Sequence, residues 1–435
     1  MPHWLVPGAI AASVLQLALM AEMPVSMAGG AELAERNSCS ADAKNAGITL
    51  PKGFCATIFA DKVGAPRHMA VGPDGTVYVN NRSRKSSSSG SLLALKDTKG
   101  QGHADVVERF GPPDDGGTGI AVYKNGVYVD LGDEIVRYDL KPGDIAPKGK
   151  PETIVSGIPQ NGDHKSRQFT IDPAGNLFLN IGSATDSCQV DNRAPESPGI
   201  DPCVELETHS GVWRFDANKT GQVFSPAARY TTGIRNAAGI DFDESGRVYA
   251  TQHGRDQLHE NWQHLYTSKQ GSEQPAEILV ELREGGDYGW PYCYFDAAQN
   301  KHVLAPEYGG DGGKAVGRCA DKLPPVAAYP AHWAPNDLKI YKANAFPESY
   351  RGGAFIAFHG SWNRSDGPQQ GYKVVFQPLA DGKASGPYTT FADGFRDGDP
   401  EGTEHRPTGL AVGPDGALYV SDDAGGRIWR IVYTG

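Results

Sequence analysis

A short pattern of alternating apolar and polar residues recurs along the chain. It is clearest at residues 69–79 and 410–420, where an alternating run, a Pro-Asp-Gly turn and a second apolar run follow one another. Glycine and the Asp or Asn beside it accept the backbone conformations that a tight chain reversal requires. Each copy therefore predicts a β-hairpin. Further copies are found at 120–129, 169–179, 240–250 and, in a looser form, 338–358.

A third strand is expected after most of these hairpins. The stretches with a strand pattern are 91–95, 134–138, 211–215, 372–376 and 427–432. Six such units predict an all-β fold, a six-bladed β-propeller. The rival architecture is a β-sandwich, which does not account for six similar hairpins. Residues 54–59 are expected to add a strand beside the last unit, because closing the ring removes exposed strand edges. The longest insertion is expected at residues 256–337, between the fourth and fifth units.

Composition supports this class and excludes some partners. The 435 residues include 55 glycines and 31 prolines, which suit many short strands and turns better than a helical bundle. Lys and Arg number 41 and Asp and Glu 52, so the formal charge is −11. This acidity argues against nucleic acid or an anionic membrane as a partner, since both favour a basic surface.

The N-terminal region has the features of an export signal. Residues 1–35 contain no Lys or Arg, residues 4–20 are mostly apolar, and Ser26-Met27-Ala28 is a small-x-small cleavage pattern. A membrane anchor is the alternative, but the apolar run is short and contains Ser13 and Gln16. We predict a signal peptide at 1–28, a tail at 29–48 and one propeller domain at 49–435. The protein would then be periplasmic or secreted, without stable membrane insertion.

Six cysteines are expected to form disulfides. An even count behind an export signal favours disulfide bonds over a metal site. Near neighbours along the chain suggest the pairs 39–55, 188–203 and 293–319, although six cysteines allow about 15 pairings. No Cys-x-x-Cys-His motif occurs, so the sequence predicts no c-type haem.

The propeller topology predicts which polar residues meet. The tight turn of each hairpin lies on one face, so residues entering the first strand and leaving the second lie on the other. The candidate residues at such positions are His164, Arg235, Asn236, Gly254, Arg255, His359 and Arg406. Lys373 starts a third strand and therefore returns from the same face. A cluster of cations in an acidic protein predicts a site for a small anionic ligand. The alternative is a ring of surface salt bridges with nearby aspartates.

Each candidate has a chemical role and an ordinary structural one. His164 is a candidate base because imidazole titrates near neutral pH, or else a loop histidine bonded to the backbone. Arg235 and Asn236 offer a forked donor and an amide to a carboxylate, or else Arg235 holds the start of a blade. Gly254 allows backbone carbonyls to face a hard cation, or else marks a simple turn.

Several further motifs are distinctive when taken together: Gly-Ile-Arg-Asn at 233–236, Tyr-Gly-Trp-Pro-Tyr-Cys at 288–293, Phe-His-Gly-Ser-Trp-Asn at 358–363, Gly-Tyr-Lys at 371–373, Arg-Pro-Thr-Gly-Leu-Ala-Val at 406–412 and Ser-Asp-Asp at 421–423. In these motifs the chain resembles one family, the soluble sugar dehydrogenases that depend on pyrroloquinoline quinone (PQQ), in particular their sorbosone and aldose dehydrogenase branch. The resemblance spans about residues 50–433. It implies a six-bladed propeller, in agreement with the independent count of repeats.

The resemblance also implies roles. His164 matches the histidine that takes the substrate proton, with Arg235 beside it. Arg235 and Asn236 match the pair next to the quinone. Lys373, Arg406 and His359 are expected to hold the cofactor, and the carbonyls of Gly254 and Arg255 to bind Ca²⁺, which would act as a Lewis acid during hydride transfer from the sugar. With no haem motif, electrons would leave to a separate acceptor, a cytochrome or a soluble quinone or dye.

Two departures from the glucose-oxidising branch favour a sorbosone-like substrate. That branch has an aspartate near the end of the third hairpin, where this chain has Ser183. It has a glutamine entering the second blade, where this chain has Gly117-Thr118. The function predicted is oxidation of an aldose or keto-aldehyde sugar. A metal-dependent lactonase and a non-enzymatic binding propeller are the alternatives.

Overall fold

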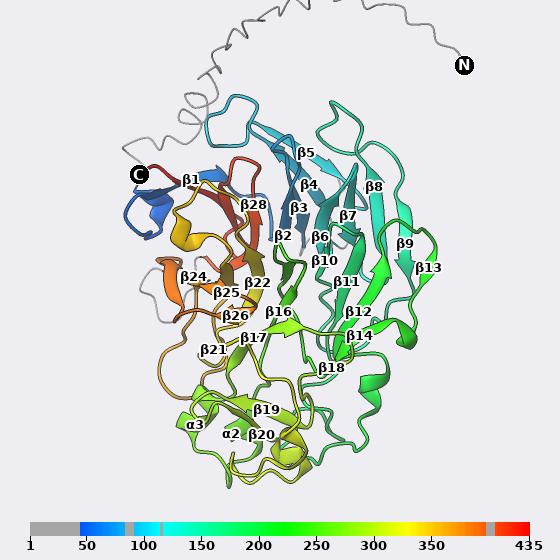
Figure 1. Ribbon diagram of the computed structural model, residues 1–435, viewed down its shortest axis with the longest axis vertical. Coiled ribbons are helices and arrows are strands. Elements are labelled where there is room, and N and C mark those ends of the chain that lie inside the picture. The colour runs from blue at the N-terminus through cyan, green and yellow to red at the C-terminus, as the bar shows by residue number, and fades with distance from the viewer. Residues whose placement is uncertain (1–43, 83–90, 114–115, 397–404) are drawn as a thin grey trace, which may run out of the picture.

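Six β-sheets follow one another around the molecule in chain order (Figure 1). The computed structural model describes residues 44–82, 91–113, 116–396 and 405–435. The first strands of successive blades contact one another in a closed ring, β2 to β6, β10, β15, β22, β28 and back to β2. The protein is therefore a six-bladed β-propeller, as the repeat predicts.

The blades each contain four or five strands. Blade 1 has β2 (Pro66–Val71), β3 (Val77–Asn81), β4 (Leu92–Lys96) and β5 (Val106–Phe110). Blade 2 has β6 (Ile120–Tyr123), β7 (Gly126–Asp130), β8 (Ile135–Asp139) and β9 (Glu152–Ser156), with β13 (Gln222–Val223) added. Blade 3 has β10 (Phe169–Ile171), β11 (Asn176–Ile181), β12 (Gly211–Asp216), β14 (Arg229–Thr232) and β18 (Gly286–Asp287).

The remaining blades are built in the same way. Blade 4 has β15 (Ile240–Phe242), β16 (Val248–Gln252), β17 (Glu277–Leu282) and β21 (Ala327–Tyr329). Blade 5 has β22 (Pro335–Ile340), β23 (Ala354–Phe358), β24 (Lys373–Gln377) and β27 (Thr389–Ala392). A small hairpin, β25 (Leu379–Ala380) and β26 (Lys383–Ala384), lies between its last two strands.

Blade 6 closes the ring with strands from both ends of the described chain. It contains β28 (Pro407–Val412), β29 (Leu418–Asp422), β30 (Ile428–Tyr433) and β1 (Phe54–Ala60). β1 pairs antiparallel with β30, with Phe54 opposite Tyr433. This confirms the strand expected at 54–59. The joint holds the ring together because opening it would break a whole strand ladder.

The core lies between neighbouring blades. All five residues of β3, β7, β23 and β29 are buried, whereas the outer strand β5 alternates between exposed and covered positions. A second strand is covered on both faces by adjacent blades, so most of its residues are apolar. Bulky side chains fill the space between sheets, among them the fully buried Trp213 and Trp429.

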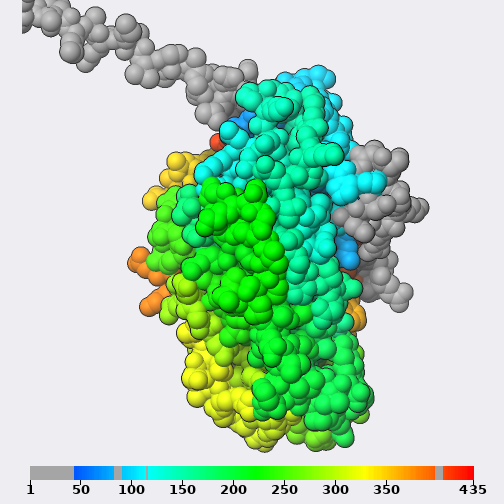
Figure 2. All heavy atoms as spheres, turned by 90° about the vertical axis from the view of Figure 1, so that its right-hand side faces the viewer, coloured from blue at the N-terminus to red at the C-terminus, as the bar shows by residue number. Residues whose placement is uncertain are grey.

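The long insertion differs from expectation. It supplies blade 4 with its third and fourth strands, β17 and β21, which the sequence pattern did not identify. It also forms α2 (Leu258–Asn261), α3 (Ser268–Glu273) and the hairpin of β19 (Cys293–Asp296) and β20 (Lys301–Leu304) at the lower end of the molecule (Figure 1). In Figure 2 the yellow part of this insertion meets the green loop that follows β11 at the same end.

Two predicted disulfides hold these segments. Cys188 is bonded to Cys203 in the loop after β11, and Cys293 to Cys319 in the insertion. Cys55 is also disulfide-bonded, while Cys39 lies outside the described residues. The predicted signal peptide and most of the tail lie outside them too. Of the tail, residues 45–47 form a short 3₁₀ turn, η1 (Asn45–Gly47). No helix in the described ranges is long and apolar enough to cross a membrane.

Candidate active site

Loops from blades 3 and 4 meet at one mouth of the ring. The backbone N–H of Ser183, after β11, donates to the carbonyl of Arg235 at 2.7 Å, just before β15. The N–H of His164, in the loop before β10, donates to the carbonyl of Ser183 at 3.3 Å. Hydrogen bonds thus connect Ser183, which follows the second strand of blade 3, to residues that precede the first strands of blades 3 and 4. The structure brings His164 and Arg235 together, 71 positions apart along the chain (235 − 164).

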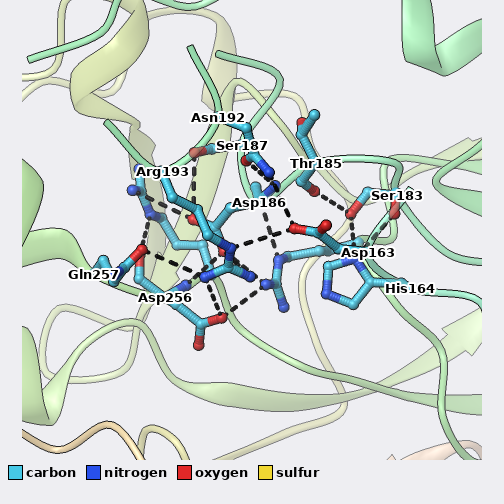
Figure 3. Close-up of polar contacts among 12 residues, drawn as sticks. Asp163, His164, Ser183, Thr185, Asp186, Ser187, Asn192, Arg193, Asp256 and Gln257 are labelled. Atoms are coloured by element: carbon cyan, nitrogen blue, oxygen red, sulfur yellow. Dashed lines mark hydrogen bonds and ion pairs between the residues drawn. The ribbon is translucent and has the colours of Figure 1, made fainter. Parts of the chain in front are cut away.

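His164 is held in one tautomer by Ser183. Its Nδ1 lies 3.0 Å from the Ser183 carbonyl oxygen and 2.9 Å from the Ser183 Oγ. The Ser183 hydroxyl itself donates to the carbonyl of Thr185 at 2.6 Å, so its Oγ faces the ring as an acceptor. Nδ1 must then carry the proton, and Nε2, which faces away from Ser183 in Figure 3, keeps its lone pair.

The electrostatic surroundings keep His164 neutral. Burial lowers the pKa of His164 well below its ordinary value, and the positive charge of Arg235 lowers it further. The backbone contact with Ser183 and the carboxylate of Asp186 only partly oppose this. A neutral imidazole with a free Nε2 is the form that accepts a proton.

Arg235 is buried and fully engaged. Its side chain is 3% exposed, and Nη2 lies 2.6 Å from Asp186 Oδ1 and 3.1 Å from Asp256 Oδ2. Nη1 donates to the carbonyl of Gly254 at 2.8 Å, and Nε to the carbonyl of Asp186 at 3.1 Å. A guanidinium buried this deeply is stable only when carboxylates and carbonyl oxygens surround it in this way.

A second arginine shares the same carboxylates. Arg193, from the loop closed by the Cys188–Cys203 disulfide, lies 3.0 Å from Asp256 Oδ2 and 3.3 Å from Asp163 Oδ2 (Figure 3). Burial raises the pKa of Asp256, but Arg235 and Arg193 more than offset this and bring it to about 2. Asp256 is therefore an anion between two guanidinium groups.

His359 and Arg406 form the other side of the mouth, from blades 5 and 6. His359 Nε2 lies 2.8 Å from Asp423 Oδ1, and Arg67 is paired with the same carboxylate. Arg406 donates through Nε to the His359 carbonyl at 3.0 Å and through Nη2 to the Gly360 carbonyl at 2.6 Å. No carboxylate forms a salt bridge with Arg406 in the part of the chain that the structure describes.

Lys373 and Asn236 are placed less directly. Lys373 pairs with Phe358 across β24 and β23, next to His359, but its Nζ lies 2.9 Å from Asp393 Oδ2, after the outermost strand. Asn236 is buried, with its Oδ1 accepting from Asn180 Nδ2 at 3.1 Å.

Gly254 and Arg255 offer backbone oxygen rather than acidic side chains. Gly254 N–H donates to Glu277 Oε2 at 2.8 Å, which fixes its peptide. The Arg255 side chain is buried and paired with Glu307, so only its backbone is available to a ligand. Across the described ranges, no three or more His, Cys, Asp or Glu side chains are grouped as metal ligands. A carbonyl oxygen has a second lone pair and suits a hard cation such as Ca²⁺, with Asp256 supplying negative charge nearby.

The expectation of a predominantly basic mouth needs correction. Arg235, His359 and Lys373 are each paired with aspartate, so the alternative of local salt bridges describes these three side chains. Their partners include Asp186 and Asp393, which enter from loops that sequence spacing does not relate to the cations. Partial burial of Arg406 lowers its pKa, although Asp423 and Asp422 partly oppose this, and an anionic ligand would stabilise its charge further.

Sequence reasoning missed several residues that shape the site. Asp186, Arg193, Glu277 and Glu307 were not singled out, although all four are bonded to the mouth or its supports. Asp186 lies three residues after Ser183 in the chain, which is the one available signal. The others belong to a disulfide loop and to the long insertion, where no repeat pattern predicts position.

Comparison with known proteins identifies relatives of this chain in sequence. The TrAA12-like family model matches residues 48–434. An uncharacterized protein from Borreliella burgdorferi is 26% identical over 401 residues, 89% of this chain and 91% of that protein. A pyrroloquinoline quinone-dependent pyranose dehydrogenase from Coprinopsis cinerea is 27% identical over 357 residues. These residues cover 72% of this chain and 46% of that protein, so the chain matches about half of its length.

Solved structures share the fold at lower identity. The PQQ domain of the Coprinopsis cinerea pyranose dehydrogenase, in its holo form, superposes with a TM-score of 0.69 at 21% identity, covering 88% of this chain and 97% of that chain. A calcium structure of a Trichoderma reesei family AA12 enzyme gives 0.71 at 17%, covering 89% and 97%. The soluble aldose sugar dehydrogenase from Escherichia coli gives 0.58 at 15%, covering 87% and 99%.

Proposed function

Because the chain belongs to the TrAA12-like family, we propose that it is a quinoprotein dehydrogenase that oxidises an aldose or keto-aldehyde sugar with PQQ and Ca²⁺. The name of the Coprinopsis pyranose dehydrogenase, a relative in sequence, supports the cofactor and the substrate class. Ser183, in place of the aspartate of the glucose-oxidising branch, supports a sorbosone-like substrate.

The contacts of Ser183 with Nδ1 of His164, from which the tautomer of the ring follows, are the observation that carries this proposal. Oxidation of a sugar C–OH group to a carbonyl removes a hydride from carbon and a proton from oxygen. Ser183 holds Nδ1–H, and both burial and Arg235 keep the imidazole neutral, so Nε2 is ready to take that proton. PQQ, when bound, supplies the hydride acceptor, and Ca²⁺ supplies a Lewis acid.

The remaining residues of the mouth would bind the cofactor and Ca²⁺ and orient them. Arg406, a half-buried cation whose side chain donates only to carbonyls, would receive a carboxylate of the cofactor, with His359 beside it. Arg235 would keep its place between Asp186 and Asp256 and direct its charge at the site without moving. The carbonyls of Gly254 and Arg255 would bind Ca²⁺, and Lys373 and Asn236 would have secondary positions.

The proposed location is the periplasm or the exterior of the cell. Two described disulfides and the signal predicted at 1–28 support an oxidising compartment. Electrons would pass to a separate acceptor, a cytochrome or a soluble quinone.

Reconstitution tests the proposal. Purified protein is titrated with PQQ and Ca²⁺, followed by absorbance, and dye reduction is measured with a panel of sugars. We expect activity only with both additions, and a loss of about 10²- to 10⁴-fold in His164→Ala, the range for removal of a general base. The control is His103→Ala, an exposed histidine in blade 1. Sugar oxidation without PQQ, or full activity of His164→Ala, would refute the assignment. Hydrolysis of a lactone would favour the metal-dependent lactonase. Binding of a ligand without turnover would favour the non-enzymatic binding propeller.

A further inference from the structure

The Trp362 side chain is exposed, in contrast to the other large aromatic side chains. Its exposed fraction is 67%, and it is the one aromatic residue among the large apolar side chains that are prominently exposed in the described ranges. Trp213 and Trp429 are fully buried. An indole ring left in water is a large amphipathic surface of the kind that proteins use for recognition.

The backbone places Trp362 at the rim of the candidate active site. It lies in the loop after β23, between Ser361, which is buried, and Asn363, which is half-buried. Asn363 Nδ2 donates to Asp256 Oδ1 at 2.7 Å, and Asp256 is the carboxylate that pairs with Arg235. The exposed Trp362 ring is therefore the direct chain neighbour of Asn363, a residue that contacts the site.

The loop that carries Trp362 is held firmly on both sides. Before it, Ser361 N–H donates to the Gln370 carbonyl, and Gln370 N–H to the Ser361 Oγ, both at 2.7 Å. After it, Arg364 Nη1 donates to the Ser272 carbonyl at 2.7 Å. Gly360 has φ of +94°, and a Cβ there would meet the Tyr372 ring at 2.2 Å, so the turn requires glycine. An aromatic ring on a fixed loop binds with little loss of conformational entropy.

We propose that Trp362 is a binding platform for the substrate, on which the C–H face of a cyclic sugar stacks. The face of an aromatic ring carries partial negative charge, and the axial C–H groups of a pyranose are weakly positive. The ring would hold the sugar by this apolar face and leave its hydroxyls to the polar groups of the mouth. The inference rests on the proposed function and specifies it, since it selects the ring-closed form of the sugar over the open-chain form.

Kinetics of loaded enzyme provide the first test. Trp362→Ala and Trp362→Phe are compared with the wild type, using a dye as acceptor and D-glucose, D-mannose and D-xylose as substrates. We expect KM to rise about tenfold in the alanine variant with kcat nearly unchanged, and the phenylalanine variant to stay close to wild type. The control is Val223→Ala, which is equally exposed at 67% but lies on β13 of blade 2.

A second readout separates this inference from the proposed function. Saturation-transfer NMR of the same sugars with cofactor-free protein reports binding without any turnover. We expect sugar signals for the wild type and Trp362→Phe that are lost in Trp362→Ala. An unchanged KM and unchanged NMR signals in Trp362→Ala, or no sugar signal from the wild type, would overturn the platform. So would a defect seen with cytochrome c as acceptor but not with dye, which would assign Trp362 to acceptor docking. Failure to bind PQQ would remove the proposed function, while the NMR comparison would still decide the role of Trp362.

Discussion

Nδ1 of His164 lies 2.9 Å from Oγ of Ser183, and that hydroxyl is turned away by its own hydrogen bond to Thr185. The imidazole therefore meets a neutral acceptor at the position where the glucose-oxidising branch is expected to have a carboxylate. This arrangement fixes the tautomer, and the Ser183 carbonyl stabilises the protonated ring only partly, without the full charge of a carboxylate. Burial and the charge of Arg235 outweigh this contact and keep the pKa of His164 low.

Introducing the carboxylate should change the pH dependence of activity. In Ser183→Asp, a negative charge beside Nδ1 would stabilise the imidazolium and raise the pKa of His164. Since the base must be unprotonated, the acidic limb of the kcat/KM profile should move to higher pH by about one unit. Ser183→Asn has the same size without the charge and should leave the limb in place. Identical profiles for the two variants would contradict the role of His164 as base.

Removal of Asp186 should destabilise the mouth. Its side chain is fully buried and accepts from Arg235 Nη2 and from the backbone N–H of Asp256 at 3.0 Å. Asp186→Ala leaves a buried guanidinium with one fewer partner, which should lower the free energy of unfolding by about 3–5 kcal/mol. Urea denaturation measures this change. Asp201→Ala removes the partner of Arg318 in an exposed pair and should cost less than about 1 kcal/mol.

Glu277 should matter to stability although it lies outside the predicted site. Its two oxygens accept from the backbone N–H groups of Gly254 at 2.8 Å and Ala334 at 3.1 Å, joining segments of blades 4 and 5. Glu277→Ala would remove the partner of both half-buried donors, which should lower the free energy of unfolding by about 1–3 kcal/mol in total. Glu281→Ala, on the same strand β17 but with a solvent-facing partner, serves as control. Equal melting temperatures for the two variants would show that the Glu277 hydrogen bonds contribute nothing to stability.

Asp130 should make stability depend on pH. It is buried at the end of β7, and burial raises its pKa to about 6 despite hydrogen bonds from Thr118 and Gly132. A folded-state pKa above the unfolded value means that the folded protein binds the proton more tightly. Its contribution to stability is thus complete below about pH 4 and is lost as pH rises through about 6.

The Asp130→Asn variant isolates this effect. The free energy of unfolding of the wild type, measured in urea at pH 4.5, 5.5 and 6.5, should include a downward slope of at most about 1.4 kcal/mol per pH unit from this group. In Asp130→Asn that component should vanish, whatever the overall stability of the variant. A slope unaffected by the substitution would mean that Asp130 ionises normally in the folded protein.

Local patterns were sufficient to predict the architecture. Each hairpin is encoded within about a dozen residues, by alternation and a turn such as the Pro-Asp-Gly before Thr76. Six repeats then determine the ring, and the topology of a blade determines which ends of the strands share a face. For this reason the meeting of His164, Arg235 and His359 at one mouth follows from the sequence, as does closure by β1.

Only the tertiary structure decided how the charges of the mouth are arranged. Asp186 and Arg193 come from a disulfide-closed loop, and Glu277 from a strand inside the long insertion. Neither segment has a repeat that would place it. Side-chain pairing depends on distances of a few ångströms between segments far apart in the chain, and burial decides how strongly each pair is needed. The sequence by itself determined the ring of blades and the face that carries the site, because both depend on local periodicity. The pairing of Arg235 with two aspartates and the neutral tautomer of His164 required the folded molecule, because they depend on contacts that periodicity does not encode.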